Sequence, residues 1–362
     1  MIRVAFIKFG GMANGGTEKY LQTIASYLPK DEFKVDFFYC DAAPYIGSDY
    51  AHQDTDGSRV EYTKSHGVNL IKVEVGAKDV TKPTHDWINT NFWELFDENN
   101  YDIIQTGRAG HPEYPFHLIK NTPIVDSIHL AGMVDGNPNI VKTVLISEDQ
   151  KRKWIGSGGN PSKAIIIPVP VETVSVNESY REEFGWEDKF VFGMHQRNDM
   201  HIFSSIPLEA YDEIEDDNTA FLILGGSANY RKQAKDLGLK NVRFLDTTSN
   251  VSLIHKFLNT LDVYAHGRSD GEQCSSSIIE GLSHSLPMIS HTAPSMGQLE
   301  QIGDAGDVVD DYIEYAEVMI SMMKDRQYYN DCVNNASKRY QEIYNVESII
   351  KKFSDLYKEV VG

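Results

Sequence analysis

Short apolar runs and helical segments alternate twice along this chain, and this repeated alternation strongly limits how the chain can fold. A strand-like run at residues 2–7 is followed by a glycine-rich turn and a helical stretch at residues 17–28 with its apolar residues on one face. A second series begins at residue 190, after a connector that contains Pro168 and Pro170. Strands that alternate with helices form parallel sheets covered by helices. The pattern therefore predicts two α/β domains.

The proline connector sets the expected domain boundaries. Two prolines within three residues stiffen an extended segment, which suits a link between domains. We expect a Rossmann-like domain over residues 1–170, a second over residues 171–343 and a terminal helix over residues 344–362. A chain of 362 residues is long enough for two such domains with proper cores.

The individual elements follow from the same periodicities. Strands are predicted at residues 35–39, 69–73, 102–105, 124–127, 143–146, 164–167, 190–193, 220–224, 241–245, 262–265 and 286–290. Helices are predicted at residues 87–96, 116–120, 208–214, 230–237, 251–258, 298–302, 312–323, 328–343 and 346–360. Residues 41–57 are predicted to form a long surface loop.

The formal net charge of -19 limits the partners of the chain, because it repels the phosphates of nucleic acids. The three cysteines (Cys40, Cys274 and Cys332) form no Cys-x-x-Cys motif, which favours free thiols in a reducing compartment. No apolar run approaches the length of a transmembrane helix, and the first residues do not form a secretory leader. These features predict a cytoplasmic protein that binds no nucleic acid.

Residues 261–290 carry the clearest candidate site. They are predicted to form a short strand, a polar turn, a helix that begins near three consecutive serines, and a second strand. Glu272 lies in the turn and Glu280 lies in the helix, on either side of the helix N-terminus. Free amides at a helix N-terminus favour a phosphate, and carboxylates accept hydrogen bonds from sugar hydroxyls. The segment therefore suits a ligand that combines a ribose, a diphosphate and a sugar.

The Glu-x7-Glu spacing, with the Leu-Pro-Met-Ile strand after it, resembles the donor-binding signature of family 4 retaining glycosyltransferases of the GT-B fold. This resemblance implies two facing Rossmann-like domains with parallel sheets and a C-terminal helix that crosses back to the first domain. It also implies that Glu272 contacts the donor sugar and that Glu280 contacts the nucleotide ribose. The neighbouring donor-binding residues would be Gln273, Cys274, Ser275 and Ser276.

Two features of the first half extend the resemblance. Gly15 and Gly16, followed by Thr17 and Glu18, resemble the Gly-Gly-x-Glu loop whose amides lie against the donor phosphate or the acceptor in this family. The alternative is a tight turn that binds no ligand. His129 follows a strand that should be buried, and the family carries a histidine there, near the donor sugar. The alternative is a histidine with a purely structural role.

The sequence departs from the family pattern in three places. Residues 273–275 stand where the family usually has glycines, and residues 168–172 replace its Asn-Gly-Val-Asp segment. Arg197 matches the arginine that clamps the donor diphosphate, but no lysine follows it in residues 198–204. Three other cations are candidates to replace that lysine, namely Arg231, Lys232 and Arg268. The missing lysine therefore favours an activity that is weakened, altered or absent.

Other motifs point to weaker hypotheses. Asp54 and Asp56 form an Asp-x-Asp pair that suits a divalent metal, but they fall in a turn, and we expect no metal site. Residues 267–271 formally match a Gly-x-Ser-x-Gly nucleophile elbow. The last histidine, His291, follows too closely to leave room for a triad acid, so a hydrolase is rejected. The basic residues 151–153 are interpreted first as a solvated helix face and second as a contact for an anionic lipid surface.

Taken with the resemblance, these features predict a glycosyltransferase that moves a sugar from a nucleotide-sugar donor to a hydroxyl of a glycan, a lipid-linked sugar or a small molecule. Retention without a metal is expected, because no carboxylate is placed as an evident nucleophile and departure of the diphosphate would drive the reaction. The candidate catalytic residues are His129, Arg197 and Glu272. A nucleotide-sugar epimerase of the same fold and a catalytically silent sugar-nucleotide-binding protein remain alternatives. No cofactor other than the donor is expected.

Overall fold

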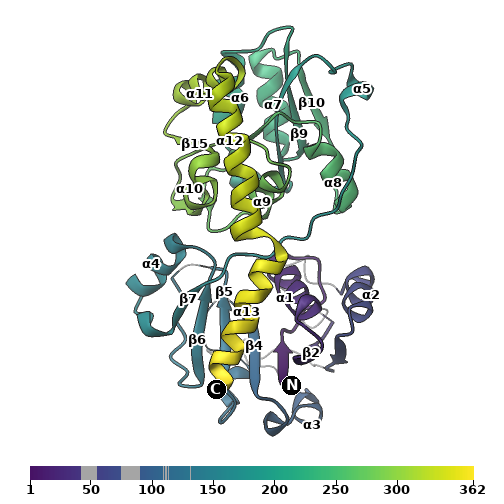
Figure 1. The fold of residues 1–362 in the computed structure, drawn as a ribbon, viewed down its shortest axis with the longest axis vertical. Coiled ribbons are helices and arrows are strands. Elements are labelled where there is room, and N and C mark those ends of the chain that lie inside the picture. Colours follow the sequence, from purple (N-terminus) through teal and green to yellow (C-terminus); the bar gives the residue numbers. More distant parts are fainter. Residues whose placement is uncertain (42–54, 75–89, 109, 111, 113, 131) are drawn as a thin grey trace. The chain divides into compact units, whose positions relative to one another are not determined.

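The computed structural model describes residues 1–41, 55–74, 90–108, 110, 112, 114–130 and 132–362 (Figure 1). These residues form two compact units. Unit 1 consists of Met1–Pro170 together with Val346–Gly362, and unit 2 consists of Val171–Asn345.

Unit 1 is built on a parallel sheet that has seven strands among the described residues, in the order β3-β2-β1-β4-β5-β6-β7. Its strands are β1 (Ile2–Ile7), β2 (Phe33–Tyr39), β3 (Asn69–Lys72), β4 (Ile103–Arg108), β5 (Ile124–Ile128), β6 (Ile140–Leu145) and β7 (Ala164–Ile166). The inner strands β4 and β5 are buried along their whole length. Each of these strands begins with two apolar residues, which the sequence pattern detects, and continues with polar residues that the fold buries.

The helices of unit 1 pack on this sheet. They are α1 (Gly16–Tyr27), α2 (Gly57–Ser65), α3 (Phe92–Leu95), α4 (Glu148–Gly156) and α13 (Val346–Val361), with 3-10 turns at Glu98–Asn100, Phe116–Leu118 and Pro161–Lys163. Helix α1 approaches β4 closely, because a Cβ at Gly107 would lie only 3.1 Å from Thr17 and 3.2 Å from Leu21. This close approach fixes the start of α1 at the carboxyl edge of the sheet.

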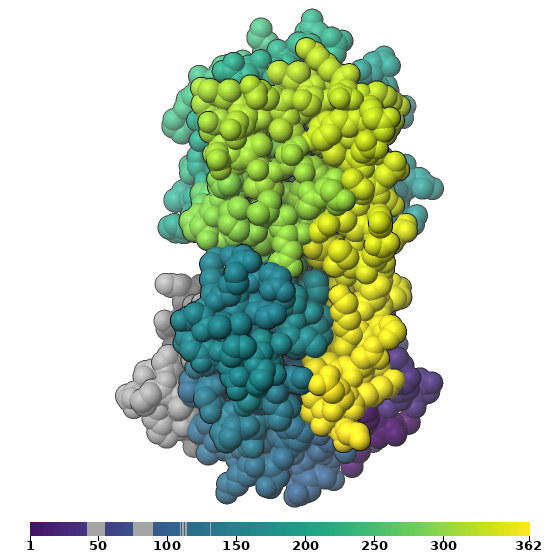
Figure 2. All heavy atoms as spheres, turned by 60° about the vertical axis from the view of Figure 1, so that its left-hand side comes forward, coloured from purple at the N-terminus to yellow at the C-terminus, as the bar shows by residue number. Residues whose placement is uncertain are grey.

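The C-terminal helix α13 packs on unit 1, as predicted. It contacts α1 and β4, and Figure 1 shows it in yellow across the strands of this unit. The hydroxyl of Tyr357 donates to Oε1 of Gln105 on β4 at 2.7 Å, and both side chains are fully buried. The space-filling view shows the outer face of the helix at the surface of the unit (Figure 2). Helix α13 is therefore part of the core of unit 1.

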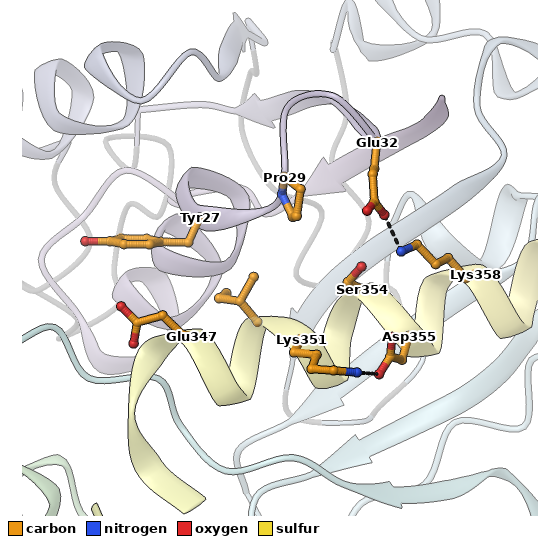
Figure 3. A pocket seen from close by; sticks show the side chains of 9 residues that line it. Tyr27, Pro29, Glu32, Glu347, Lys351, Ser354, Asp355 and Lys358 are labelled. Carbon is orange, nitrogen blue, oxygen red and sulfur yellow. Dashed lines mark hydrogen bonds and ion pairs between the residues drawn. The ribbon is translucent and has the colours of Figure 1, made fainter. Parts of the chain in front are cut away.

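A groove of 420 Å³ runs between the end of α1 and α13 (Figure 3). Lys358 of α13 forms an ion pair with Glu32 across it, and Lys351 pairs with Asp355 at 2.6 Å along the helix. The apolar floor includes Pro29 and Ile350. The Lys358–Glu32 pair ties the exposed side of α13 to the turn after α1.

Unit 2 repeats the same architecture. Its main sheet is parallel and has the strand order β10-β9-β8-β11-β13-β15. These strands are β8 (Phe190–Gln196), β9 (Thr219–Gly225), β10 (Val242–Leu245), β11 (Val263–Ala265), β13 (Met288–His291) and β15 (Gly306–Val309). The helices are α5 (Arg181–Phe184), α6 (Ile206–Asp212), α7 (Ala228–Leu237), α8 (Val251–Leu258), α9 (Ser276–Ser283), α10 (Gly297–Ile302), α11 (Tyr312–Lys324) and α12 (Arg326–Arg339). Two short 3-10 turns (Met200–Ile202 and Gly303–Ala305) and a π-helical turn (Tyr340–Tyr344) complete the unit.

The two-sheet prediction is confirmed, and the remaining differences are local. A short parallel ladder, β12 (Gly271–Glu272) with β14 (Ser295–Met296), was not expected, because two-residue strands carry no alternation. Helix α2 begins at the end of the predicted loop 41–57, where Asp56 caps its first turn. Residues 42–54 of that loop lie outside the described residues. The segment 116–120 is a 3-10 turn instead of a longer helix. Within the described chain, every helix is too short or too polar to cross a bilayer.

Candidate active site

Helix α9 begins directly after the polar turn that follows β11. Ser275 is the N-cap residue, and its carbonyl oxygen accepts the amide of Ile279 at 3.3 Å. The buried face of the helix, which includes Ile278 and Ile279, anchors it in the core. The first amides of a helix have no partner within the helix and carry a partial positive charge. Those of Ser276 and Ser277 therefore suit an anion at the carboxyl edge of the sheet.

Two buried glutamines of α10 hold the turn before α9. Gln301 accepts the Ser275 amide at 2.7 Å and donates to the Ser275 carbonyl oxygen at 3.0 Å. Gln298 accepts the Glu272 amide at 3.1 Å. A Cβ at Gly297 would lie 2.0 Å from the Gln273 carbonyl oxygen, so only glycine permits this packing. The Ser275 amide, on a residue predicted to bind the donor, is thus bonded inside the protein.

The remaining residues of this turn also have neighbours in unit 2. The side chain of Gln273 donates to Oγ of Ser295 on β14 at 2.9 Å. Cys274 is half-buried, and its Sγ lies 3.5 Å from the side-chain nitrogen of Gln301. Ser276 is exposed at the helix start. Gln273 and Cys274 therefore support the shape of the turn, while Ser276 faces solvent.

Glu280 lies on α9, one turn after its start, and its side chain is 17% exposed. Oε2 of Glu280 lies 2.7 Å from Nε2 of His195, the next-to-last residue of β8. The sequence did not single out His195. A histidine at the carboxyl end of an apolar strand was the signal that could have found it, because ligand crevices lie outside those strand ends.

Glu272 is held from two sides at the end of β12. Nη1 of Arg268 donates to its Oε1 at 3.1 Å, and Nε2 of His266 lies 3.9 Å from the same oxygen. Burial alone would raise the pKa of Glu272, but the contact with His266 and the positive charge of Arg268 outweigh burial and hold the pKa below its usual value. Glu272 is therefore a carboxylate at neutral pH, suited to accept hydrogen bonds.

The cationic side chains that are candidates to bind the diphosphate differ in their surroundings. Arg197 follows β8, is 65% exposed, and pairs with Asp199 at 2.9 Å. Arg268 is 20% exposed and binds both Asp270 and Glu272. Arg231 pairs with Asp246 at 3.6 Å, and Lys232 pairs with Asp236 on α7. Among the three proposed substitutes for the missing lysine, Arg268 is thus the one in contact with Glu272.

In unit 1, the glycine-rich turn precedes α1. Gly15 is the N-cap residue and Gly16 the first residue of the helix. The Glu18 carboxylate folds back over Gly15, because a Cβ there would lie 2.1 Å from Oε2 of Glu18. Gln22 donates to the carbonyl oxygens of Gly11 and Ala13 at 2.8 and 3.0 Å, which fixes the turn from below. The turn is therefore anchored to α1 by hydrogen bonds, and Gly16 is exposed at the start of the helix.

His129 follows β5, beside α1. Its ring lies edge-on to Tyr20, with the ring centroids 4.5 Å apart, and its Nε2 is buried without a hydrogen-bond partner among the described residues. Burial, with a smaller effect of Lys8, lowers the pKa of His129 to about 3. The imidazole is therefore neutral at physiological pH. The structure brings His129 and the helix of the glycine-rich turn together through Tyr20.

The described residues support neither a metal site at the Asp-x-Asp pair nor a lipid contact at residues 151–153. Across the part of the chain that the structure describes, no group of three or more His, Cys, Asp and Glu side chains is arranged to hold a metal ion. Asp54 lies outside the described residues, and Asp56 caps α2 by accepting the Ser58 amide at 2.8 Å. In the basic cluster of α4, Lys153 pairs with Asp149 at 2.6 Å, as does Arg152 at 3.4 Å.

Residues 177–339, which span most of unit 2, match the family model described as glycosyl transferases group 1. This part of the chain is therefore similar to group 1 glycosyltransferases. Glycosyltransferases of this group use nucleotide-sugar donors. A comparison with curated protein sequences gives no significant match.

Solved structures show that this chain has the GT-B fold. The Anabaena protein Alr3699/HepE, in complex with UDP and glucose, has a TM-score of 0.70 at 16% identity, and the match covers 99% of this chain and 100% of that one. A glycosyltransferase from Rickettsia africae has a TM-score of 0.77 at 14% identity, with 99% and 98% covered. The sucrose-phosphate synthase of Thermosynechococcus elongatus has a TM-score of 0.71 at 14% identity, with 99% of both chains covered.

Proposed function

We propose that this protein is a glycosyltransferase that moves a sugar from a nucleoside-diphosphate sugar to an acceptor hydroxyl, with retention and without a metal. The observation that carries the proposal is the position of Glu272 and Glu280 on either side of the α9 N-terminus, in the unit that matches the family model. Unit 2 would be the donor side and unit 1 the acceptor side. The acceptor class stays broad: a glycan, a lipid-linked sugar or a small molecule.

The donor would lie along the carboxyl edge of the unit 2 sheet. The amides of Ser276 and Ser277 would bind the diphosphate, because the helix N-terminus supplies free donors and a partial positive charge. Glu280 would accept the ribose hydroxyls, and Glu272 would accept hydroxyls of the donor sugar. Gln273, Cys274 and Ser275 would hold the turn, and Gly15 and Gly16 would offer amides to the phosphate or the acceptor.

The transfer breaks the bond between the anomeric carbon and the diphosphate oxygen, and forms one between that carbon and the acceptor oxygen. The electron pair of the broken bond stays on the diphosphate, which also takes the acceptor proton. Arg197 would stabilise this leaving group after exchanging Asp199 for phosphate, assisted by Arg268. The neutral ring of His129 would hydrogen-bond the sugar without adding charge.

A uridine diphosphate sugar is the first donor to test. The Anabaena protein with the same fold is described in complex with UDP-glucose. The likeness covers nearly the whole chain, at 16% identity. It therefore gives the first donor to test, and the experiment below identifies the base and the sugar.

A second candidate function is binding without turnover. Two observations favour it: Arg197 is exposed and paired with Asp199, and residues 198–204 contain no lysine. A diphosphate held by one cation fewer is a poorer leaving group, while the ribose and sugar contacts would be unaffected.

The experiment offers wild-type protein a panel of UDP-, ADP- and GDP-sugars and measures sugar release and transfer to added acceptors. The transferase predicts slow release from one donor, with a loss of at least tenfold in kcat/KM for Glu280→Ala and no change for the exposed control Glu317→Ala. Binding without any turnover supports the second candidate. Interconversion of two donors without release shows an epimerase, and no binding of any donor overturns the proposal.

A further inference from the structure

His195 lies beside the carboxylate that the proposed function assigns to the ribose. Its Nε2 is 2.7 Å from Oε2 of Glu280, and the two side chains are 12% and 17% exposed. A carboxylate only accepts hydrogen bonds, so Nε2 of the imidazole carries the proton. The contact joins the end of β8 to α9. One oxygen of Glu280 is therefore fixed by a neighbouring strand.

The other side of the imidazole is fixed by Tyr264. This residue is fully buried on β11, and its hydroxyl lies 3.2 Å from Nδ1 of His195. The same hydroxyl accepts the His195 amide at 3.3 Å. Burial raises the pKa of Tyr264 well above its ordinary value, so the phenol stays protonated, and its one proton faces both Nδ1 and the carbonyl oxygen of His195, which lies 3.3 Å away. The contact with Glu280 assigns Nε2 as the donor, and Nδ1 on the opposite side of the ring lies against the Tyr264 hydroxyl.

The other two histidines near α9 do not take part in this contact. His255 on α8 and His284 at the end of α9 bond to each other, with Nδ1 and Nε2 2.6 Å apart. Burial lowers the pKa of both rings, that of His284 to about 4. His195 is therefore the histidine bonded to Glu280.

We propose that His195 is a positioning residue that holds Glu280 ready for the vicinal hydroxyls of a ribose, so that the site selects ribonucleotides over nucleotides without these hydroxyls. A glutamate side chain left alone samples several rotamers and must be ordered when ligand binds. With Oε2 held by His195, Oε1 has no protein partner within the described residues and can accept both hydroxyls. The inference rests on the proposed role of Glu280 and extends it to a residue outside the family signature.

The experiment measures dissociation constants of UDP, ADP and GDP and of their 2′,3′-dideoxy counterparts by calorimetry on the full chain. The first variant is His195→Phe, which removes the hydrogen-bond donor to Glu280. The second is His195→Gln, which keeps a nitrogen that can donate a hydrogen bond. Glu280→Ala reports the loss of the carboxylate, and His201→Gln is an exposed control in the same unit. Thermal unfolding of each variant shows that it folds.

Wild-type protein should bind the ribonucleotide at least tenfold more tightly than the dideoxy form. We expect this ratio to fall below threefold in His195→Phe and to be largely kept in His195→Gln. In the double variant His195→Phe, Glu280→Ala, the ratio should be no lower than in Glu280→Ala alone. A ratio that is lost in Glu280→Ala but unchanged in His195→Phe overturns the role of His195 alone. A ratio unaffected by Glu280→Ala, or a wild-type protein that binds no nucleotide, overturns the ribose site and this inference with it.

Discussion

Gln301 binds Ser275 through both ends of its side-chain amide, accepting the Ser275 amide at 2.7 Å and donating to the Ser275 carbonyl oxygen at 3.0 Å. Because Ser275 is the N-cap residue of α9, this pair determines where the helix starts and where its first free amides point. A buried glutamine on α10 thus shapes a site to which it contributes no atom. Sequence spacing alone could not show this relationship.

Replacing Gln301 with leucine should leave the buried Ser275 amide and carbonyl unpaired. We expect a loss of about 1–3 kcal/mol in the free energy of unfolding, together with at least tenfold weaker nucleotide binding, because the α9 N-terminus loses its support. Urea denaturation and calorimetry measure the two effects, with the exposed Gln327→Leu as control. Unchanged nucleotide affinity in a destabilised Gln301→Leu protein would show that the turn keeps its shape without Gln301.

The hydroxyl of Tyr357 anchors α13 to β4 through Gln105. Tyr357→Phe should lower the free energy of unfolding of unit 1 by about 1–2 kcal/mol, because a buried acceptor on Gln105 loses its donor. Hydrogen exchange of the α13 amides measures the effect, with Tyr312→Phe at the surface as control. Faster exchange in unit 2 but not in α13 would contradict this account of how the helix is held.

His129 should make unit 1 less stable in mild acid. Its pKa is about 3 in the folded protein, against about 6.5 in the unfolded chain. The unfolded state therefore binds more protons below pH 6.5, and stability that is present above this pH is lost as the pH falls. Between pH 7 and pH 5 the loss amounts to about 2 kcal/mol. His129→Gln should abolish this part of the loss in urea denaturation series at each pH.

Nuclear magnetic resonance of the His129 ring provides the direct control for that prediction. Because the imidazole is neutral in the folded state, its ring signals should not shift between pH 8 and pH 5. A midpoint near pH 6.5 would show that the ring is solvated and would remove the expected stability difference.

Arg268 should keep Glu272 ionised in acid. The pKa of Glu272 lies below its usual value, and the Arg268 charge is one of its causes. In Arg268→Ala the pKa should rise toward or above its usual value near 4.3, so the acid limb of the pH–rate profile of sugar release should move to higher pH. Arg197→Ala, which does not contact Glu272, should lower the rate by about 10- to 100-fold without moving this limb. An unmoved limb in Arg268→Ala would contradict the role of Glu272 as a carboxylate in the reaction.

The sequence predicted the features that depend on local pattern. Both parallel sheets and the last helix follow from apolar runs that alternate with helical periodicity. The positions of Glu272 and Glu280 around a helix N-terminus follow from the same reasoning, because a turn and a helix were visible in residues 261–290. Features that depend on long-range contacts were not predicted. Gln298 and Gln301 are polar residues that the fold buries, and they contact a turn 26 residues away in the sequence.

His195 was missed for a related reason. It lies 85 residues from Glu280, and only the pairing of β8 with β11 brings the strand end beside α9. Arg197, in contrast, was singled out by its match to the family motif, and the structure has its guanidinium paired with Asp199 at the surface. Motif matching identified the type of residue but carried no information on its neighbours.

A crystal structure of the full chain soaked with the nucleotide sugar that it binds most tightly tests the central claim most directly. We predict diphosphate oxygens within about 3 Å of the Ser276 and Ser277 amides, ribose hydroxyls on Oε1 of Glu280, and the sugar beside Glu272. A nucleotide bound away from the α9 N-terminus, with Glu272 and Glu280 still bonded only to protein, would contradict it.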